Sequence, residues 1–207
     1  MAPRATILAS GAGTNARNVL EGVRAGKLPI DVTAIVCDRA GAGVLEVARD
    51  FAVPALTVVW DRRAESRGAF DARVVDAVAS TRPDLVLMLG WMHLVPPAFL
   101  ARFPQTINVH PAYLPLDPAA DYDVAPDGTH VPALRGAHAL RDALAQRVAW
   151  IGATVHYVTA ETDRGEVLAR IPVAVDDAAT ESALREKVRA AEFAAVDEAI
   201  RSWCARR

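Results

Sequence analysis

The chain has 207 residues, 52% of them hydrophobic and 23% charged, and a formal net charge of −2. Such a composition is typical of a globular protein that buries a full core, and it excludes a mainly disordered chain. The lack of a basic surplus argues against nucleic acid as a partner, and no apolar stretch approaches the roughly 20 residues that span a bilayer.

Short apolar runs alternate with longer segments of helical periodicity, a pattern typical of βαβ units. The early runs, such as 85–89, are apolar on both faces, as expected for a parallel sheet covered by helices on both sides. The predicted fold is therefore α/β: a Rossmann-like open, mostly parallel sheet with helices on both faces and an antiparallel C-terminal strand, in a single domain over residues 1–207. Strands are predicted near 5–10, 31–37, 55–59, 84–90, 105–110, 149–159 and 166–175, and helices near 14–25, 43–52, 66–81, 96–103, 136–147 and 180–204.

A glycine-rich turn joins the first predicted strand to the first helix and contains Gly11, Ala12, Gly13, Thr14 and Asn15. Glycine lets the backbone approach a ligand, and the N–H groups at a helix N-terminus attract anions. The turn is therefore interpreted as a phosphate-binding loop. It also fits a dinucleotide fingerprint, in which Asp38 after the second strand would bind a ribose, so this second interpretation stays open.

Asn108 and His110 lie two residues apart on a predicted strand, so their side chains should project from the same face. An amide donor and an imidazole that converge on one atom can stabilise an oxyanion and move a proton. A carboxylate from a later loop, Asp163, is expected to orient the histidine and to raise its pKa. We predict that these three residues catalyse acyl transfer without a covalent enzyme intermediate.

An acidic segment from Leu116 to Ala133 follows the strand that carries Asn108. Its aspartates have no neighbouring run of Lys or Arg, so we expect a poorly packed, mobile flap beside the active site. His156, within a later apolar strand, is predicted to be a hydrogen-bonded structural histidine.

The two cysteines, Cys37 and Cys204, lie far apart and form no CxxC pair. This usage predicts neither a disulfide framework nor a zinc site, and it fits a reducing compartment. The first apolar stretch breaks at Ser10, too early for a signal peptide. We therefore expect a cytoplasmic protein that needs no metal, with small-molecule substrates and no membrane partner; its oligomeric state stays open.

An ordered set of short motifs extends over roughly residues 4–203: Ser10–Asn15, Pro83–Val86, Gly90–Met92, Asn108–Pro111 with Leu114–Pro115, Gly136–His138, Gly152–His156 and Asp163–Gly165. The set resembles the phosphoribosylglycinamide formyltransferases, a branch of the folate-dependent formyltransferase superfamily. The most specific element for the superfamily is the Asn-x-His-Pro sequence with the later Asp. The phosphate loop near the N-terminus narrows the resemblance to this branch.

The resemblance implies transfer of a formyl group from 10-formyltetrahydrofolate, as co-substrate, to the primary amine of glycinamide ribonucleotide in purine biosynthesis. It implies that Asn108, His110 and Asp163 are catalytic. The ribonucleotide would be bound by Gly11, Ala12, Gly13, Thr14, Asn15, Arg67, Met92, Pro111 and Glu192. The reduced folate would be bound by His93, Val95, Val158, Thr159, Ala160, Glu161 and Thr162.

The sequence also departs from the family's pattern. The family usually has aromatic-Pro-Gly at 134–136, where this chain has Leu-Arg-Gly, and Asp-Gly-Gly-Pro at 163–166, where this chain has Asp-Arg-Gly-Glu. His93 stands at a position usually held by a basic residue, and the segment 116–133 is longer than the family's. Three alternatives therefore stay open: formyl transfer to another amine such as an amino sugar, an NAD-dependent oxidoreductase, and a non-catalytic folate or nucleotide binder.

Overall fold

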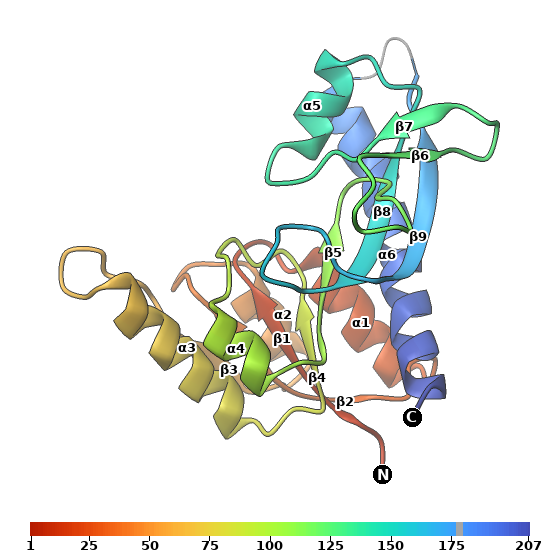
Figure 1. The fold of residues 1–207 in the computed structure, drawn as a ribbon. Coiled ribbons are helices and arrows are strands. Elements are labelled where there is room, and N and C mark those ends of the chain that lie inside the picture. The colour runs from red at the N-terminus through yellow and green to blue at the C-terminus, as the bar shows by residue number, and fades with distance from the viewer. Residues whose placement is uncertain (177–179) are drawn as a thin grey trace. The chain divides into compact units, whose positions relative to one another are not determined.

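The computed structural model describes residues 1–176 and 180–207. They form two compact units, Met1–Asn108 and Val109–Arg207. Strands and helices follow one another in both units (Figure 1). That the whole chain folds as a single domain stays a prediction.

The first unit is a parallel sheet in the strand order β3-β2-β1-β4-β5. Its central strands are buried along nearly their whole length, which explains why they are continuous apolar runs. Parallel strands end at a common edge of the sheet, so the loops after β1 and β4 are neighbours. The elements are β1 (Arg4–Ala9), α1 (Thr14–Arg24), β2 (Asp31–Cys37), α2 (Val44–Asp50), β3 (Ala55–Thr57), α3 (Arg67–Ser80), β4 (Leu85–Met88), α4 (Pro97–Arg102) and β5 (Thr106–His110).

The second unit starts within β5 and contains the antiparallel pair β8 and β9, the separate hairpin of β6 and β7, and two helices. A core cluster that includes Leu140, Ile151, Leu184 and Val188 joins both helices to β8. The long last helix begins at a threonine cap, because the Thr180 hydroxyl accepts a hydrogen bond from the N–H of Ala183 at 3.2 Å. The elements are β6 (Tyr122–Val124), β7 (His130–Pro132), α5 (Ala139–Ala145), β8 (Trp150–Tyr157), β9 (Val167–Ala174) and α6 (Glu181–Ala205).

The predicted α/β fold is confirmed: within the described residues, the main sheet has seven strands and is mostly parallel, with β9 antiparallel to β8. All predicted strands and helices are present, with ends that differ by a few residues. The hairpin β6–β7 was not predicted, because it lies in the segment that was expected to be a loop.

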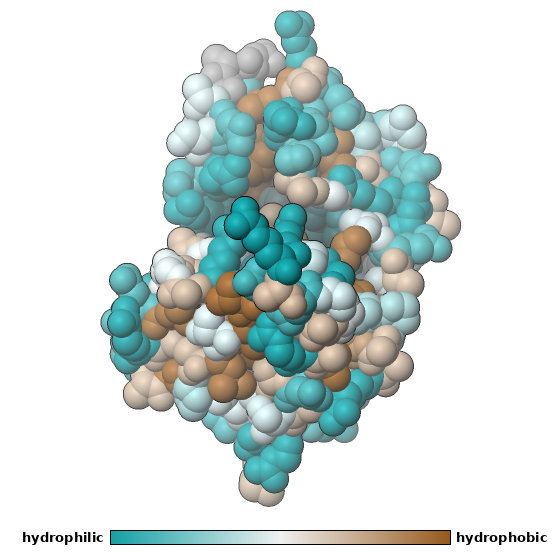
Figure 2. All heavy atoms as spheres, turned by 90° about the vertical axis from the view of Figure 1, so that its left-hand side faces the viewer, coloured by the Kyte–Doolittle hydropathy of each residue, from teal (hydrophilic) through white to brown (hydrophobic). Residues whose placement is uncertain are grey.

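Figure 2 shows one face of the molecule, on which hydrophilic side chains surround smaller hydrophobic areas. In the part of the chain that the structure describes, no helix combines the length and the apolar character that crossing a bilayer requires.

Candidate active site

The end of β5 and the loop between β8 and β9 bring His110 and Asp163 together in the second unit. Nδ1 of His110 lies 3.4 Å from Oδ2 of Asp163, and the two side chains are only 6% and 9% exposed. The predicted pairing of this histidine with this carboxylate is therefore present in the fold. Because both groups are shielded from water, a proton exchanged between them is held at a defined place.

A second imidazole, which was not predicted to belong to the site, contacts the same carboxylate. Nε2 of His156, on β8, lies 3.4 Å from Oδ1 of Asp163. Its Nδ1 lies 2.8 Å from the carbonyl oxygen of Tyr157, and since a carbonyl only accepts, Nδ1 carries a hydrogen. His156 is hydrogen-bonded as predicted. Its contact with Asp163 depends on how the loop folds back, which the spacing of the two residues does not reveal.

Residues 134–136 supply main-chain groups to both members of the His110–Asp163 pair. The carbonyl oxygen of Leu134 accepts a hydrogen bond from Nε2 of His110 at 2.6 Å. The N–H of Gly136 donates to Oδ2 of Asp163 at 2.8 Å. Because Nε2 carries the hydrogen toward Leu134, a second proton on the ring would sit on Nδ1, facing Asp163. This short segment therefore fixes the orientation of the imidazole and of the carboxylate.

Burial and charge act in opposite directions on the pKa of His110. Desolvation lowers this pKa from its ordinary value of 6.5 and outweighs the charge of Asp163 and the hydrogen bond to Leu134, which both raise it. The imidazole is therefore neutral at neutral pH in the ligand-free protein. The expectation that Asp163 raises the pKa is correct for that contact, but wrong for the net shift, because the sequence does not show how deeply the ring is buried.

The pKa of Asp163 is lowered in spite of its burial. Desolvation alone raises this pKa, but the contacts of the carboxylate with His156 and with His110 outweigh it. With the N–H of Gly136 they lower the pKa from 3.8 to about 2. Asp163 is therefore ionised around neutral pH.

We expect Asp163 to make the protein sensitive to acid. A carboxylate whose pKa falls from 3.8 to about 2 on folding contributes roughly 2 kcal/mol, which is fully present above about pH 4 and is lost as the pH falls through about 2. The destabilisation caused by Asp163→Asn should therefore shrink as the pH is lowered from 5 toward 2. Urea unfolding of both proteins across this range measures it; a difference that does not change with pH would contradict the assignment.

Asn108 lies on β5 two residues before His110 and is half-buried, between fully buried neighbours. Alternation along the strand places its side chain on the same face as that of His110. An amide at this position is suited to donate a hydrogen bond to an oxyanion. This role stays a prediction.

The loop after β1 has the geometry of an anion cradle. Gly13 has a φ of 78°, and a Cβ at this position would lie 2.7 Å from Cα of Val44, so only glycine fits. Helix α1 begins at the next residue and, within the described residues, has no side-chain cap and no acid in its first turn. The first N–H groups of α1 therefore point toward the loop, and no side chain at the cap accepts from them. Helix α3 differs, because the Ser66 side chain caps it.

Two hydrogen bonds join this glycine-rich loop to the loop after β4. The N–H of Ser10 donates to the carbonyl of Gly90, and the N–H of Met92 donates to the hydroxyl of Ser10, both at 3.0 Å. Met92, which was predicted to offer its carbonyl to the substrate amine, therefore lies in a segment whose backbone is fixed to the loop.

His93, predicted to contact folate, turns its side chain toward Asp38. Nε2 of His93 lies 2.9 Å from Oδ2 of Asp38, whose side chain is only 5% exposed. The imidazole also contacts three aromatic rings, those of Trp60, Phe70 and Trp91. The carboxylate that the dinucleotide interpretation assigns to a ribose is thus buried and engaged within the protein.

The other predicted ligand-binding residues lie on several elements, and their roles stay predictions. Arg67, at the start of α3, places its guanidinium 2.7 Å from the carboxylate of Asp71 and donates to the carbonyl of Leu94. Residues 159–162, at the start of the loop that leads to Asp163, are exposed. The half-buried members of the set are Val95, Pro111, Val158 and Glu192.

Residues 3–200 match the formyl transferase family. The chain belongs to this family. It is 38% identical over 192 residues to the phosphoribosylglycinamide formyltransferase of Mycobacterium tuberculosis, covering 91% of this chain and 79% of that protein. The enzyme of the same name from Escherichia coli K12 is 29% identical, covering 96% of this chain and 85% of that protein. Glycinamide ribonucleotide transformylase 1 from Symbiobacterium toebii has a similar solved structure, with a TM-score of 0.87 at 35% identity, covering 99% of this chain and 89% of that chain.

Membership of the formyl transferase family decides against the oxidoreductase interpretation of the glycine-rich loop. The bond between Asp38 and His93 agrees with this, because it removes the ribose-binding acid that the alternative requires. Within residues 1–176 and 180–207, no group of three or more His, Cys, Asp or Glu side chains is arranged to hold a metal ion.

The acidic segment of this formyl transferase is an anchored hairpin. Asp123 forms an ion pair with Arg170, and Asp127 accepts a hydrogen bond from the indole N–H of Trp150 at 2.9 Å. Asp121 forms ion pairs with two arginines. The expectation that these aspartates lack basic partners is therefore wrong, because the partners come from distant parts of the sequence and not from a neighbouring basic run. Asp121 and Asp127 are exposed, as expected, and the role of the segment as a flap stays a prediction.

Proposed function

We propose that this formyl transferase moves the formyl group of 10-formyltetrahydrofolate to the primary amine of glycinamide ribonucleotide. The observation that carries the proposal is the buried His110–Asp163 pair, which follows Asn108 on the same strand in a chain of the formyl transferase family. Relatives that bear the name phosphoribosylglycinamide formyltransferase support this choice of acceptor.

In the proposed reaction, the acceptor amine attacks the formyl carbon and a C–N bond forms while the carbonyl electrons move to oxygen. The amide of Asn108 and the Nε2 hydrogen of His110 stabilise this oxyanion. For that, His110 must exchange its hydrogen bond to Leu134 for one to the substrate. The negative charge of the oxyanion favours proton uptake by the ring, which offsets the desolvation that lowers its pKa.

Asp163 completes the proton transfers. As an ionised carboxylate it attracts the proton that leaves the attacking amine, through His110 or a bound water. When the tetrahedral intermediate collapses, the bond to the folate nitrogen breaks and that nitrogen takes up a proton. The products are the formylated amine and tetrahydrofolate, so atoms and charge balance without an added reactant.

Two groups of residues are assigned to substrate binding in this proposal. The ribonucleotide phosphate is bound by residues 11–15 with Arg67, and its ribose by Glu192. The main-chain carbonyls of Met92 and Pro111 accept hydrogen bonds from the amine. The reduced folate is bound by His93, Val95 and residues 158–162.

The deciding experiment mixes purified protein with 10-formyltetrahydrofolate and glycinamide ribonucleotide and follows the release of tetrahydrofolate by absorbance. Release that depends on the ribonucleotide supports the proposal. Release that needs an amino sugar would show a formyl transferase with another acceptor, and release of formate without any amine would show hydrolysis. Either result would overturn the assignment of the acceptor.

The loop of residues 11–15 should bind a monophosphate and not a dinucleotide. Gly13→Ala is expected to weaken binding of the ribonucleotide at least tenfold, because the added Cβ would lie 2.7 Å from Val44 and displace the loop. Titration calorimetry with the ribonucleotide, inorganic phosphate and NAD measures this. Saturable, tight NAD binding by the unmodified protein would contradict the monophosphate assignment.

A further inference from the structure

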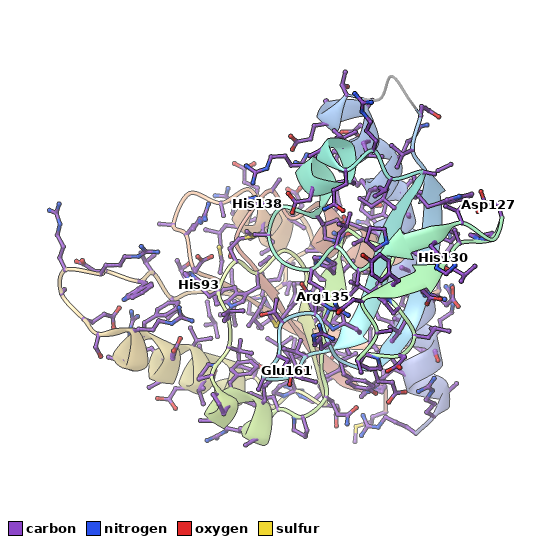
Figure 3. All side chains as sticks on the ribbon, turned by 45° about the horizontal axis from the view of Figure 1, so that its top comes forward. His93, Asp127, His130, Arg135, His138 and Glu161 are labelled. Atoms are coloured by element: carbon purple, nitrogen blue, oxygen red, sulfur yellow. The ribbon has the colours of Figure 1, made fainter. Side chains whose placement is uncertain are left out.

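Arg135 links the hairpin β6–β7 to the loop that carries Asp163 (Figure 3). Its Nη1 lies 2.9 Å from Oδ1 of Asp121, and its Nη2 donates to the carbonyl of Ala120 at 2.6 Å. Its Nε donates to the carbonyl of Asp163 at 3.3 Å. The side chain is only 15% exposed. A guanidinium offers its donors in a fixed plane, so this one side chain holds two segments of the chain at a defined separation.

Arg164 makes a second link between the same two segments. Its Nη2 lies 2.8 Å from Oδ1 of Asp121, and its Nη1 donates to the carbonyl of Pro118 at 2.9 Å. The Asp121 carboxylate thus lies between two guanidinium groups. Hydrogen bonds from Arg164 and then from Arg135 lower the pKa of Asp121. We refer to Asp121, Arg135 and Arg164 as the clamp.

The clamp adjoins two main-chain groups that orient the His110–Asp163 pair. Arg135 stands between Leu134, whose carbonyl accepts from His110, and Gly136, whose N–H donates to Asp163. Asp163 itself has a φ of 53°, a left-handed conformation that Asp adopts more readily than most residues but that is still uncommon. Such a conformation persists when surrounding contacts hold it, and the bond from Arg135 to the Asp163 carbonyl is one of them.

We propose that Asp121, Arg135 and Arg164 are positioning residues for formyl transfer, which tie the hairpin to residues 134–136 and to the Asp163 loop and so hold the Asp163 carboxylate against His110. The proposal rests on the proposed function, in which His110 and Asp163 act on the substrates. An exposed ion pair alone contributes little. Here the Asp121 side chain is 66% exposed, whereas the side chains of Arg135 and Arg164 are 15% and 29% exposed, and without Asp121 they lose their shared partner.

The kinetic test compares Asp121→Ala with Asp127→Ala. Both remove one aspartate from the same hairpin, but Asp127 lies at its far end from Arg135 and binds Trp150 (Figure 3). Asp121→Ala should lower kcat on the order of tenfold and leave KM for both substrates within about twofold, because a misplaced catalytic group costs turnover more than binding. Asp127→Ala should leave kcat unchanged, and Asp121→Glu should restore part of the loss.

Arg135→Ala tests whether the clamp acts as one unit. Its effect on kcat should reach about 10²-fold, and the double variant with Asp121→Ala should lose no more than Arg135→Ala alone. Thermal unfolding shows whether each variant is folded. If Arg135→Ala does not fold, the comparison of Asp121→Ala with Asp127→Ala carries the test, since both positions are on the surface.

A readout that needs no substrate separates this proposal from the proposed function. Imidazole nitrogen resonances of His110 and His156, and the amide resonance of Gly136, should shift in Asp121→Ala and not in Asp127→Ala. If the unmodified protein does not transfer formyl groups but these shifts occur, the proposed function fails and the clamp stands. Equal kcat values for the two aspartate variants, with unshifted resonances, would overturn the clamp.

Discussion

His110→Ala and Asp163→Asn are each expected to lower the turnover of formyl transfer by about 10²–10⁴-fold. In the proposed mechanism, His110 supplies the hydrogen that stabilises the oxyanion, and Asp163 supplies the negative charge that attracts the transferred proton. The two side chains lie 3.4 Å apart and are nearly free of solvent, so water cannot replace either of them. Steady-state kinetics with both substrates saturating measures the loss in kcat.

His130→Ala is the matched control for the first substitution, because it removes an exposed histidine from β7 of the same unit. Its kcat should equal that of the unmodified protein. Binding of the ribonucleotide to the two active-site variants should change far less than kcat. Nearly full turnover of Asp163→Asn with saturating substrates would remove Asp163 from the mechanism.

Gly165→Ala is expected to have the largest effect on the fold. A Cβ at this position would lie 1.6 Å from the carbonyl oxygen of Tyr157. That oxygen cannot retreat easily, because His156 donates to it and the N–H of Tyr157 is bound to Glu166. Overpacking against fixed backbone should cost on the order of 3 kcal/mol, which lowers Tm by roughly 6–12 °C in a chain of this size, and should displace the adjoining Asp163.

Gly41→Ala is the control, since a Cβ at Gly41 meets no atom within 4 Å and the residue is exposed. It should leave Tm within about 1 °C of the unmodified value, as expected for a surface substitution. Calorimetry or circular dichroism measures both variants. A Gly165→Ala protein with unchanged Tm and kcat would mean that the loop after β8 can shift without consequence for Asp163.

Local sequence patterns predicted most of the fold. The β1 and β4 strands are buried along nearly their whole length, as their apolar sequences predicted. The hairpin β6–β7 was missed because its strands have only three residues each and contain a proline and an aspartate. Ion pairs with Arg135, Arg164 and Arg170 hold the hairpin in place. No local sequence pattern shows which distant charged residues will form ion pairs.

The sequence predicted the candidate site residues that lie in a single motif. It did not predict contacts between residues on different elements. Asn108 and His110 follow from their spacing on a strand, and Asp163 from the resemblance and its place on a loop. The contact of His156 with Asp163 and the bond of His93 to Asp38 join residues on different elements. The lowered pKa of His110 depends on burial, which is a property of the folded chain alone.

The hydrogen bond from His110 to the Leu134 carbonyl has a consequence for mutational scanning. Every residue at position 134 presents the same main-chain oxygen, so a library of side-chain replacements there would report only on packing of the buried Leu134 side chain. In the proposed mechanism, this oxygen competes with the substrate for the hydrogen on Nε2 of His110. Its strength could be tuned only by chemistry on the backbone itself, such as an amide-to-ester replacement, which weakens the acceptor without changing any side chain.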